Sequence, residues 1–394
     1  MKTAGIICEY NPYHMGHLGH IEYTRSALGH DSAIVCIMSG NFVQRGDFAV
    51  FNKHARAETA VRCGADLVLE MPLPYVLSSA EGFASAGVYI LDKLRICGYI
   101  SFGSESGDLG ALKEAAEAMA STQADAMMKE WLDKGFSYAS SRQKAADAVL
   151  GSRSDMLMSP NNLLGIEYLK SMAAYDSQMQ PMTIKRIGGM HDGETGYSAS
   201  ALRNKLLHEG DPWKYMPPVA SAVYKKEIAG GQGPVSTKMC ELAILSRLRA
   251  VEDFSKLPGA SEGLWRRISR YAASGSTIEM ILESIKTKRY AMSRLRRMLM
   301  CACLGLSALD TQEPPPYIRV LAMNRTGMRL LKEARRTAEL PIITKPASVK
   351  KMQGSIAEMF MKEAASTDLY VLAYPDENKR QGGQEWQKGP VIVT

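Results

Sequence analysis

Short apolar runs and longer helical patterns alternate along the first half of the chain. Helical periodicity follows several of the runs, for example over residues 53–64 and 79–93. Runs that are apolar at successive positions are typical of strands buried on both faces. The alternation predicts an α/β fold with a doubly wound parallel sheet, in which ligands bind at the carboxyl ends of the strands. The predicted strands are residues 3–8, 33–38, 66–73, 98–103 and 182–187.

The remainder of the pattern predicts a helical insertion and a second domain. Residues 109–149 are helical in pattern and contain no strand-like run, and a helix opens at Ser198 after a loop over 188–197. Glycine and proline cluster at 229–234, and helical patterns then dominate up to about residue 305. Apolar runs alternate with helices again near the end, at 317–323, 341–346 and 368–374. We therefore predict a catalytic domain over 1–225 and a C-terminal domain over 226–394 that is helical and then mixed α/β.

Length and composition agree with this division but decide little about function. The chain has 394 residues, of which 46% are hydrophobic, so it is longer than one core usually serves. A formal net charge of +7 and a sequence pI near 8.9 suit a protein that meets a polyanion. A surplus of this size is also common in proteins that bind no nucleic acid.

The cysteines and the N-terminus indicate a reducing compartment. Seven cysteines are scattered, most of them in apolar runs, which is typical of reduced core residues. Cys301 and Cys303 have no second pair elsewhere, so no metal site is predicted. No secretory signal and no apolar stretch long enough to span a membrane is evident. We expect a cytoplasmic protein without a membrane partner.

The loop after the first predicted strand carries two histidines on either side of a glycine. It reads NPYHMGH, so His14 and His17 flank Gly16 where the strand gives way to a helix. A helix N-terminus offers unpaired N–H groups and a partial positive charge, and glycine lets a phosphate approach the backbone. The two imidazoles can donate hydrogen bonds to a phosphate whose charge grows as it is attacked. The loop therefore predicts transition-state stabilisation at the α-phosphate of ATP; plain helix capping is the alternative.

A second candidate motif, YSASALR, opens the helix after the fifth predicted strand. Ser198 suits the N-cap, Ser200 falls in the first turn and Arg203 lies one turn further on. A serine-lined helix start with an arginine suits the β- and γ-phosphates of a leaving pyrophosphate. Serine-initiated helices with an arginine are common, so the motif taken alone favours an ordinary helix start.

Further segments extend these two motifs to a family resemblance. The histidine and serine–arginine motifs resemble those of the HIGH superfamily of nucleotidyltransferases and class I aminoacyl-tRNA synthetases. The full set is similar to the bacterial tRNA(Met) cytidine acetate ligase family, and the similarity runs over nearly the whole chain. In chain order the segments are EYNPYHMGHLGH, SGNFVQRGDFAV, GADLVLEMPLPY, FGSESGD, SPNNLLGIEYL and SRLRRML.

The resemblance implies a fold, a reaction and its substrates. The fold would be the Rossmann-like sheet of HIGH nucleotidyltransferases with a helical insertion and a tRNA-binding C-terminal domain. The enzyme would join acetate to the α-phosphate of ATP, forming acetyladenylate and releasing pyrophosphate. It would then transfer the acetyl group to the wobble cytidine of elongator tRNA(Met), giving N4-acetylcytidine. ATP would serve as a substrate, with Mg²⁺ as a cofactor.

The resemblance also implies an ATP site drawn from several loops. Gly103 would let the nucleotide pack close to a strand end, and its alternative is a turn glycine. Asn161 or Asn162 would bind ribose or base, or only cap a helix. Arg186 would clamp phosphate or lie on the surface. The implied ATP-binding set is Ile7, Glu9, Tyr10, Asn11, Pro12, His14, Gly16, His17, His20, Gly103, Asn161, Asn162, Arg186, Ser198, Ser200 and Arg203.

The loop after the second predicted strand offers candidates for the carboxylate substrate. It reads SGNFVQRGD, and Gln44, Arg45 and the following Lys53 could bind acetate or the transferring phosphoryl group. A solvated loop is the alternative. Glu9 could help to hold Mg²⁺ or orient a neighbour. The predicted catalytic residues are His14, His17, Arg45 and Lys53.

Basic residues around 286–300 predict the RNA-binding surface. They gather at the start of a helix whose apolar residues Leu295, Met298 and Leu299 can face a core, which leaves the positive face free for phosphates. Such contacts position an RNA without specifying it. The alternative is a solvated charged face. The predicted RNA-binding residues are Lys286, Lys288, Arg289, Arg294, Arg296 and Arg297.

Two other classes of function remain open at this point. A small-molecule adenylyltransferase of the same superfamily would use the histidine loop without needing the basic C-terminal half. A non-catalytic RNA-binding protein would keep the nucleotide fold without its chemistry.

Overall fold

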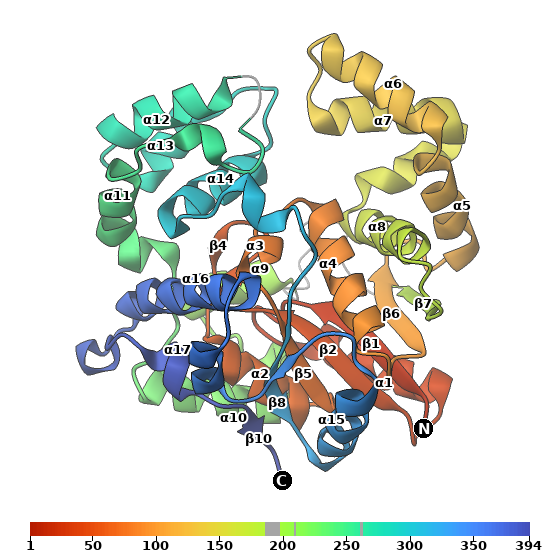
Figure 1. Cartoon of the computed structure of the whole chain (residues 1–394), viewed down its shortest axis with the longest axis vertical. Coiled ribbons are helices and arrows are strands. Elements are labelled where there is room, and N and C mark those ends of the chain that lie inside the picture. The colour runs from red at the N-terminus through yellow and green to blue at the C-terminus, as the bar shows by residue number, and fades with distance from the viewer. Residues whose placement is uncertain (186–197, 209, 261–262) are drawn as a thin grey trace.

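The structure, a computed structural model, describes residues 1–185, 198–208, 210–260 and 263–394. Eight strands of these residues form one sheet in the order β10-β8-β5-β2-β1-β6-β7, with β9 paired to β8 (Figure 1). Strands β5, β2, β1, β6 and β7 are parallel, and β8 is antiparallel to β5. The sheet strands are β1 Thr3–Cys8, β2 Ala33–Ser39, β5 Leu67–Met71, β6 Tyr99–Ser104, β7 Gln180–Lys185, β8 Ile318–Met323, β9 Ile342–Ile343 and β10 Val391–Ile392.

The central strands are apolar throughout because both faces of the sheet are buried. In β2, Val35 and Ile37 belong to one core, whereas Ile34, Cys36 and Met38 belong to the core on the other face. Successive side chains of a strand point to opposite faces, so a strand covered on both sides needs no polar alternation. The strands predicted over 3–8, 33–38 and 98–103 are confirmed, and the one predicted over 66–73 is the shorter β5.

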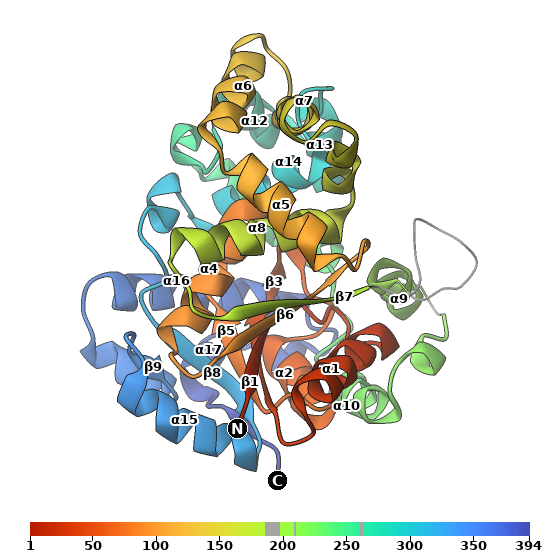
Figure 2. The same cartoon turned by 90° about the vertical axis from the view of Figure 1, so that its right-hand side faces the viewer.

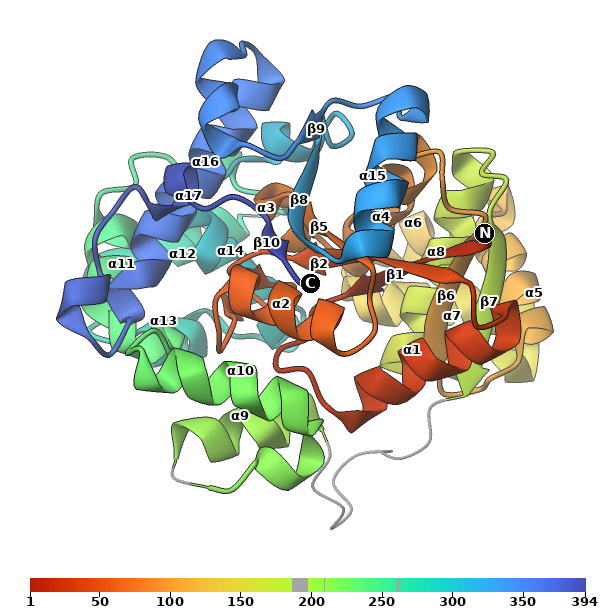
Figure 3. The same cartoon turned by 90° about the horizontal axis from the view of Figure 1, so that it is seen from below.

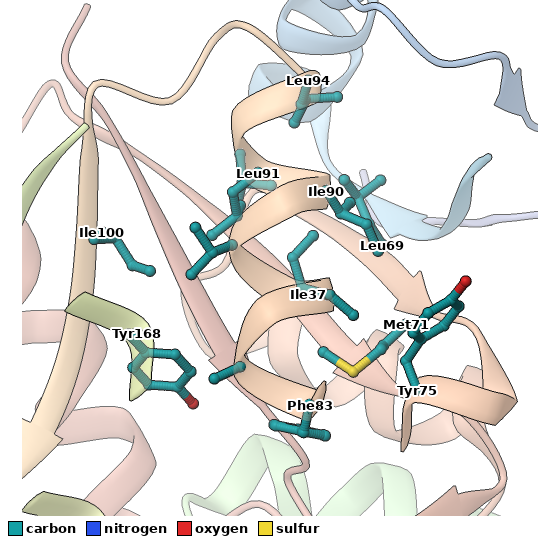
Figure 4. Close-up of a cluster of buried hydrophobic side chains, with 14 of the residues drawn as sticks. Ile37, Leu69, Met71, Tyr75, Phe83, Ile90, Leu91, Leu94, Ile100 and Tyr168 are labelled. Carbon is teal, nitrogen blue, oxygen red and sulfur yellow. The ribbon is translucent and has the colours of Figure 1, made fainter. Parts of the chain in front are cut away.

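Helices cover both faces of the sheet (Figures 2 and 3). Helices α4, α8 and α15 lie on one face, and α1, α2 and α10 lie on the other. Figure 4 shows Ile90 and Leu91 of α4 packed toward Ile37, Leu69 and Ile100 of the sheet. These helices are α1 Met15–Leu28, α2 Lys53–Arg62, α4 Ala80–Lys93, α8 Pro160–Ala174, α10 Pro218–Ala229 and α15 Arg325–Thr337.

The helical insertion predicted over 109–149 is confirmed. It consists of α5 Leu109–Met119, α6 Thr122–Asp133 and α7 Tyr138–Leu150. Helix α5 packs on α8, while α6 and α7 pair with each other and project from the body of the molecule (Figure 1).

A second group of helices builds its own core after residue 240. It contains α11 Glu241–Arg249, α12 Leu264–Ser274, α13 Ile278–Ile285 and α14 Met292–Leu304, as the helical pattern predicted. The core of this group also takes Phe42 and Phe48 from the short strands β3 Phe42–Val43 and β4 Asp47–Phe48. The loop after β2 is thus anchored to the C-terminal helices.

The central sheet itself crosses the predicted boundary at residues 225/226. Strand β8 pairs with β5, and β10 pairs with β8, so residues from both predicted domains share one sheet. Helix α16 Ser355–Tyr370 contributes Met359 and Phe360 to the sheet core and Leu369 and Tyr370 to the helical core. That residues 1–225 form the catalytic domain and residues 226–394 a separate tRNA-binding domain stays a prediction.

Two predicted elements near strand ends differ from the structure. The apolar run at 368–374 is helical, because α16 continues to Tyr370 and a short 3-10 turn covers Val371–Ala373. Its apolar residues are buried by helices rather than by neighbouring strands, and a short run alone does not distinguish these cases. Strand β7 begins at Gln180 rather than 182, and Arg186 and the loop over 188–197 lie outside the described residues.

Candidate active site

The loop after β1 orients its two histidines through a reciprocal cap on α1. His14 is the N-cap, and its Nδ1 accepts a hydrogen bond from Gly16 N at 3.1 Å. His17 Nδ1 in turn accepts from His14 N at 3.2 Å, and the two rings stack with centroids 3.8 Å apart. A Cβ at residue 16 would lie 3.0 Å from His14 Cε1, so glycine allows this close packing without a shift of the imidazole. The histidines therefore cap the helix, as the alternative interpretation predicted, and the same contacts orient both rings.

This arrangement assigns the position of the ring proton in both imidazoles. Because each Nδ1 accepts a backbone N–H, the ring proton belongs on Nε2. Tyr10 and Tyr13 pack against His17 with ring centroids 4.9 Å and 5.5 Å away, which limits rotation of its ring. The loop thus holds two Nε2–H donors in a fixed orientation.

Helix α9 Ala199–Leu207 reaches the histidine loop through Arg203. Ser198 is the N-cap, as predicted, and its Oγ accepts from Ala201 N at 3.1 Å. Arg203 Nη1 donates to Asn11 O at 2.7 Å, and Nη2 donates to Ser200 Oγ at 2.9 Å. This contact brings the two motifs together at Arg203 and Asn11, which are 192 residues apart in the chain.

Glu9 joins this site to the loop that follows β2. Its Oε1 accepts from Gln44 N at 2.7 Å. Burial raises the pKa of Glu9, and the hydrogen bond from Gln44 together with the charges of Arg56, Arg203 and Arg45 opposes that rise. Arg45 itself is exposed. Three arginines, from α2, α9 and the loop after β2, therefore act on one carboxylate beside the histidines.

Arg56 is a residue of this region that the sequence analysis missed. Its guanidinium is fully buried and donates to carbonyl oxygens of both loops: Glu9 O after β1, and Ser39 O and Gly40 O after β2. Nε donates to Phe51 O at 3.0 Å. An arginine within the helical pattern of 53–64 was the only available signal, and its burial follows from the packing of α2 on the sheet.

The third part of the predicted ATP site lies at the end of β6. Gly103 is in β6, and Glu105 just beyond it accepts hydrogen bonds from Asn161 N, Asn161 Nδ2 and Asn162 N at the start of α8. Burial favours a higher pKa for Glu105, but these hydrogen bonds outweigh it and lower the pKa. Asn162 is buried and accepts from Ser106 N at 3.0 Å, whereas Asn161 is only half-buried. Of the two asparagines, Asn161 is the more accessible to a ligand.

His20 lies one turn beyond His17 and faces β6. Its Nε2 is 2.9 Å from Ser101 Oγ, which also contacts Thr24 Oγ1 at 2.8 Å. These contacts fix α1 on the sheet next to the strand that carries Gly103.

Lys53 lies in a different environment from the one predicted. Its ammonium is 1% exposed and contacts Glu70 Oε1 at 2.6 Å and Glu385 Oε1 at 2.7 Å, with Glu363 Oε2 4.0 Å away. Arg319 pairs with the same Glu70 and Glu385. Burial, with the nearby charge of Arg319, lowers the pKa of Lys53 to about 8 although the carboxylates oppose this. A catalytic role for Lys53 has no support from these contacts.

The six basic residues predicted to bind RNA divide into two sets. Lys286, Lys288 and Arg296 are exposed, and Lys286 Nζ donates to Tyr290 O. Arg294 donates to Gly259 O at 2.8 Å and Arg297 to Gln44 O at 3.5 Å, and these two residues and Arg289 are partly buried. The basic start of α14 therefore touches the loop that carries Arg45.

Neither a metal cluster nor a membrane span is found within the described ranges. No three His, Cys, Asp or Glu side chains of these residues gather as a metal site, and Cys301 and Cys303 are buried free thiols. No helix of the described chain is long and apolar enough to cross a bilayer. Mg²⁺ at a nucleotide is commonly held by one or two carboxylates and the phosphates themselves, so Glu9 and Asp47 near Arg203 are compatible with such an ion.

Comparison with known proteins gives the family of this chain. A model of the HIGH Nucleotidyl Transferase family matches residues 1–385. The tRNA(Met) cytidine acetate ligase of Acetivibrio thermocellus is 36% identical over 417 aligned residues, with both chains covered in full. The chain belongs to the tRNA(Met) cytidine acetate ligase family. A second member, from Caldanaerobacter subterraneus, is 38% identical over 388 residues, which cover 95% of this chain and 96% of the relative.

Solved structures of the family share the fold of this chain along its whole length. Thermotoga maritima TmcAL bound with alpha-thio ATP matches with a TM-score of 0.92 at 31% sequence identity, and its apo form matches with 0.93 at 30%. Both alignments cover 100% of each chain. The predicted family and the predicted α/β fold are confirmed.

Proposed function

We propose that this chain uses ATP to ligate acetate to a cytidine of tRNA(Met), as the name of its family states. The observation that carries the proposal is the contact of Arg203 with the histidine loop, which brings two phosphate-binding motifs together at the carboxyl edge of the sheet. Relatives with this name match the chain over its full length, and one structural relative binds an ATP analogue. Within this function, acetyladenylate as the intermediate and the wobble cytidine of elongator tRNA(Met) as the acceptor are the finer parts of the proposal.

ATP binding is assigned to the residues around the meeting point of the loops. The backbone N–H groups at the start of α9 suit phosphate oxygens, and the end of β6 with Asn161 suits ribose or base. The proposed set is Ile7, Glu9, Tyr10, Asn11, Pro12, His14, Gly16, His17, His20, Gly103, Asn161, Asn162, Ser198, Ser200 and Arg203, with Arg186 outside the described residues.

In the first step the histidines act on the α-phosphate. An acetate oxygen attacks the α-phosphorus, the bond to the β-phosphate oxygen breaks, and pyrophosphate leaves. His14 and His17 donate from Nε2 to the non-bridging oxygens, whose charge grows in the transition state. Within the described residues, Arg203 uses two of its five N–H donors on Asn11 and Ser200, and we assign the leaving pyrophosphate to the other donors.

Arg45 is the proposed partner of the acetate carboxylate. It is exposed, it follows Gln44, whose backbone is fixed on Glu9, and a guanidinium fork pairs both oxygens of a carboxylate. In the second step the cytidine N4 attacks the acetyl carbonyl carbon, the bond to the AMP oxygen breaks, and N4 loses a proton. Mg²⁺, held with Glu9 or Asp47, would neutralise phosphate charge.

The exposed part of the basic set supports the RNA partner. Lys286, Lys288 and Arg296 can contact phosphates, and α14 lies directly against the Arg45 loop. Transfer RNA is a cytoplasmic substrate, so the predicted cytoplasmic location follows from this proposal.

The test separates the first step from the second. Purified protein with acetate, ATP and labelled pyrophosphate, without RNA, should form labelled ATP. No exchange at any acetate concentration would contradict the proposal. A small-molecule adenylyltransferase would instead exchange without acetate, in the presence of its own acceptor. Mass spectrometry of tRNA from a deletion strain then identifies the product, since loss of N4-acetylcytidine from one tRNA assigns both substrate and position.

A further inference from the structure

A cavity of about 280 Å³ lies between the Arg45 loop and the C-terminal helices. Gly46 and Asp47 form one wall, and residues of α11, α13 and α14 form the others. Pockets for small organic ligands span roughly 300–1,000 Å³, so this one suits a single ring system. Of the residues proposed for ATP, acetate and Mg²⁺, only Asp47 lines it, so the cavity adjoins the proposed ATP site and extends away from it.

The interior of the cavity is apolar and adaptable. Leu248 of α11, Leu282 of α13 and Leu299 of α14 contribute buried side chains, and Met292 and Met300 lie beside them. Leucine and methionine can cover the faces of a flat ring, and methionine adjusts readily to its outline.

Carboxylates outnumber cations in the lining of the cavity. Lys238 and Glu241 pair with each other there. Glu279 and Glu283, one turn apart on α13, are exposed carboxylates that line it, and Asp47 lies on the opposite wall. Arg296, also in the lining, belongs to the exposed basic set of α14. Carboxylates repel phosphate but accept hydrogen bonds from an exocyclic amino group. A polynucleotide would thus keep its backbone on the basic residues and place a neutral base inside.

The cavity is also coupled to the catalytic loop. A Cβ at Gly46 would lie 2.5 Å from Arg297 N and 2.6 Å from Arg296 C, so this loop rests directly on the backbone of α14. The charge of Asp47 acts on Arg203, which contacts the histidine loop. A group bound in the cavity therefore lies one loop away from the proposed chemistry.

We propose that the cavity binds an unstacked amino-bearing nucleobase, cytosine or adenine, of the RNA substrate. The proposal rests on the RNA-modifying function above and adds the place where one base is held. Single-stranded loops are commonly recognised by bases turned out into such pockets, while the backbone follows a basic surface. Glu279 and Glu283 accept from the amino group, and uracil, which presents an acceptor at the same position, is disfavoured.

Filling the cavity is the first test. Met292→Trp places an indole in the space from a half-buried position, and Met280→Trp on α13, at a position 51% exposed, is the matched control. We expect Met292→Trp to lower kcat/KM for acetyl transfer to tRNA by roughly 10-fold or more, the usual effect of losing a specific base contact. Acetate-dependent pyrophosphate exchange should stay within twofold, and Met280→Trp should change neither activity. Normal transfer by Met292→Trp would overturn the proposal.

A direct binding test does not depend on catalysis. Ligand-observed NMR with millimolar cytidine, adenosine and uridine should show binding of the first two to the wild-type protein and loss of binding in Met292→Trp. AMP saturates the nucleotide site during these measurements, so that adenosine cannot report on it. In Glu279→Gln/Glu283→Gln, whose amides can also donate, the preference for cytidine over uridine should fall. Equal binding of all three nucleosides to the wild-type protein, or none, refutes the base pocket.

The outcomes also separate this proposal from the function on which it rests. Absence of acetate-dependent exchange in the wild-type protein would count against the ligase, whereas the nucleoside measurements would still judge the cavity. If Met292→Trp loses exchange as well as transfer, the variant has disturbed the fold, and the near-isosteric glutamine variants decide the question.

Discussion

Replacement of Arg203 by lysine tests the connection between the two phosphate-binding motifs. The guanidinium spans Asn11 O at 2.7 Å and Ser200 Oγ at 2.9 Å with separate nitrogens, which a single ammonium cannot reproduce. At least one hydrogen bond from a charged donor is lost, worth about 1.5–3 kcal/mol. At 0.59 kcal/mol for RT this corresponds to a fall of roughly 10- to 150-fold if the contact is needed in the transition state.

The assay for this prediction is acetate-dependent pyrophosphate exchange without RNA, measured over a range of ATP concentrations. Ser200→Ala is the matched variant, since it removes only one anchor of Arg203 and should cost about 0.5–1.5 kcal/mol, up to roughly 10-fold. A loss in kcat/KM with an unchanged thermal midpoint would assign the effect to the site rather than to folding. If Arg203→Lys keeps exchange within twofold of the wild type, the convergence of the motifs has no role in the first step and the reasoning fails.

Four further predictions follow from separate parts of the structure. His17→Ala removes an oriented Nε2–H donor and should lower the exchange rate on the order of 100-fold; a change below fivefold would contradict the role assigned to the imidazole. In Gly46→Ala the new Cβ would meet a backbone atom near 2.5 Å at a φ of +78°, so the variant should lose about 2 kcal/mol or more of stability and show less pyrophosphate exchange and less acetyl transfer. At Gly19 a Cβ meets nothing within 4 Å, so Gly19→Ala should be neutral or stabilising. Similar chemical denaturation of the two variants would refute this. Burial, together with the charge of Glu70, raises the pKa of Glu363 to about 7, so between about pH 4.5 and 7 the native protein holds a proton that the unfolded chain has released. The stability contributed by this group is present below that range and is lost as the pH rises through it. Glu363→Gln should therefore flatten the pH dependence of the free energy of unfolding, which urea titrations at pH 5 and 8 would detect. A chain ending at residue 225 lacks β8 and Arg319 and should aggregate, because the edge of β5 is then open and Glu70 has lost one of its two cations; a soluble, cooperatively unfolding fragment would be the contrary result.

Local chemistry explains which parts of the fold could be predicted. The strands at 3–8 and 33–38 are visible because burial on both faces leaves an unbroken apolar run, and Ser198 is visible as an N-cap because its side chain bonds within three residues. In the site, the pairing of His14 and His17 across Gly16 is equally local.

The features that escaped prediction depend on partners far away in the chain. Lys53 was assigned to substrate because it follows the loop that carries Gln44 and Arg45, yet its partner Glu385 lies 332 residues further on. In the sequence, Arg56 cannot be distinguished from an ordinary helical arginine, because its partners Glu9 O and Ser39 O lie in other segments of the chain. The pattern of apolar residues does not predict that β8 pairs antiparallel with β5, because a strand buried on both faces has the same pattern in either direction.

The ion cluster around Lys53 also sets an order of events during protein synthesis. Lys53 and Glu70 are made early, whereas Arg319, Glu363 and Glu385 follow about 250 to 330 residues later. At 5–20 residues per second the ribosome needs roughly 20 to 60 seconds to reach Glu385 after Lys53. Throughout that interval the nascent N-terminal half carries the Lys53–Glu70 pair without Arg319, Glu363 and Glu385, and the edge of β5 is not yet covered by β8.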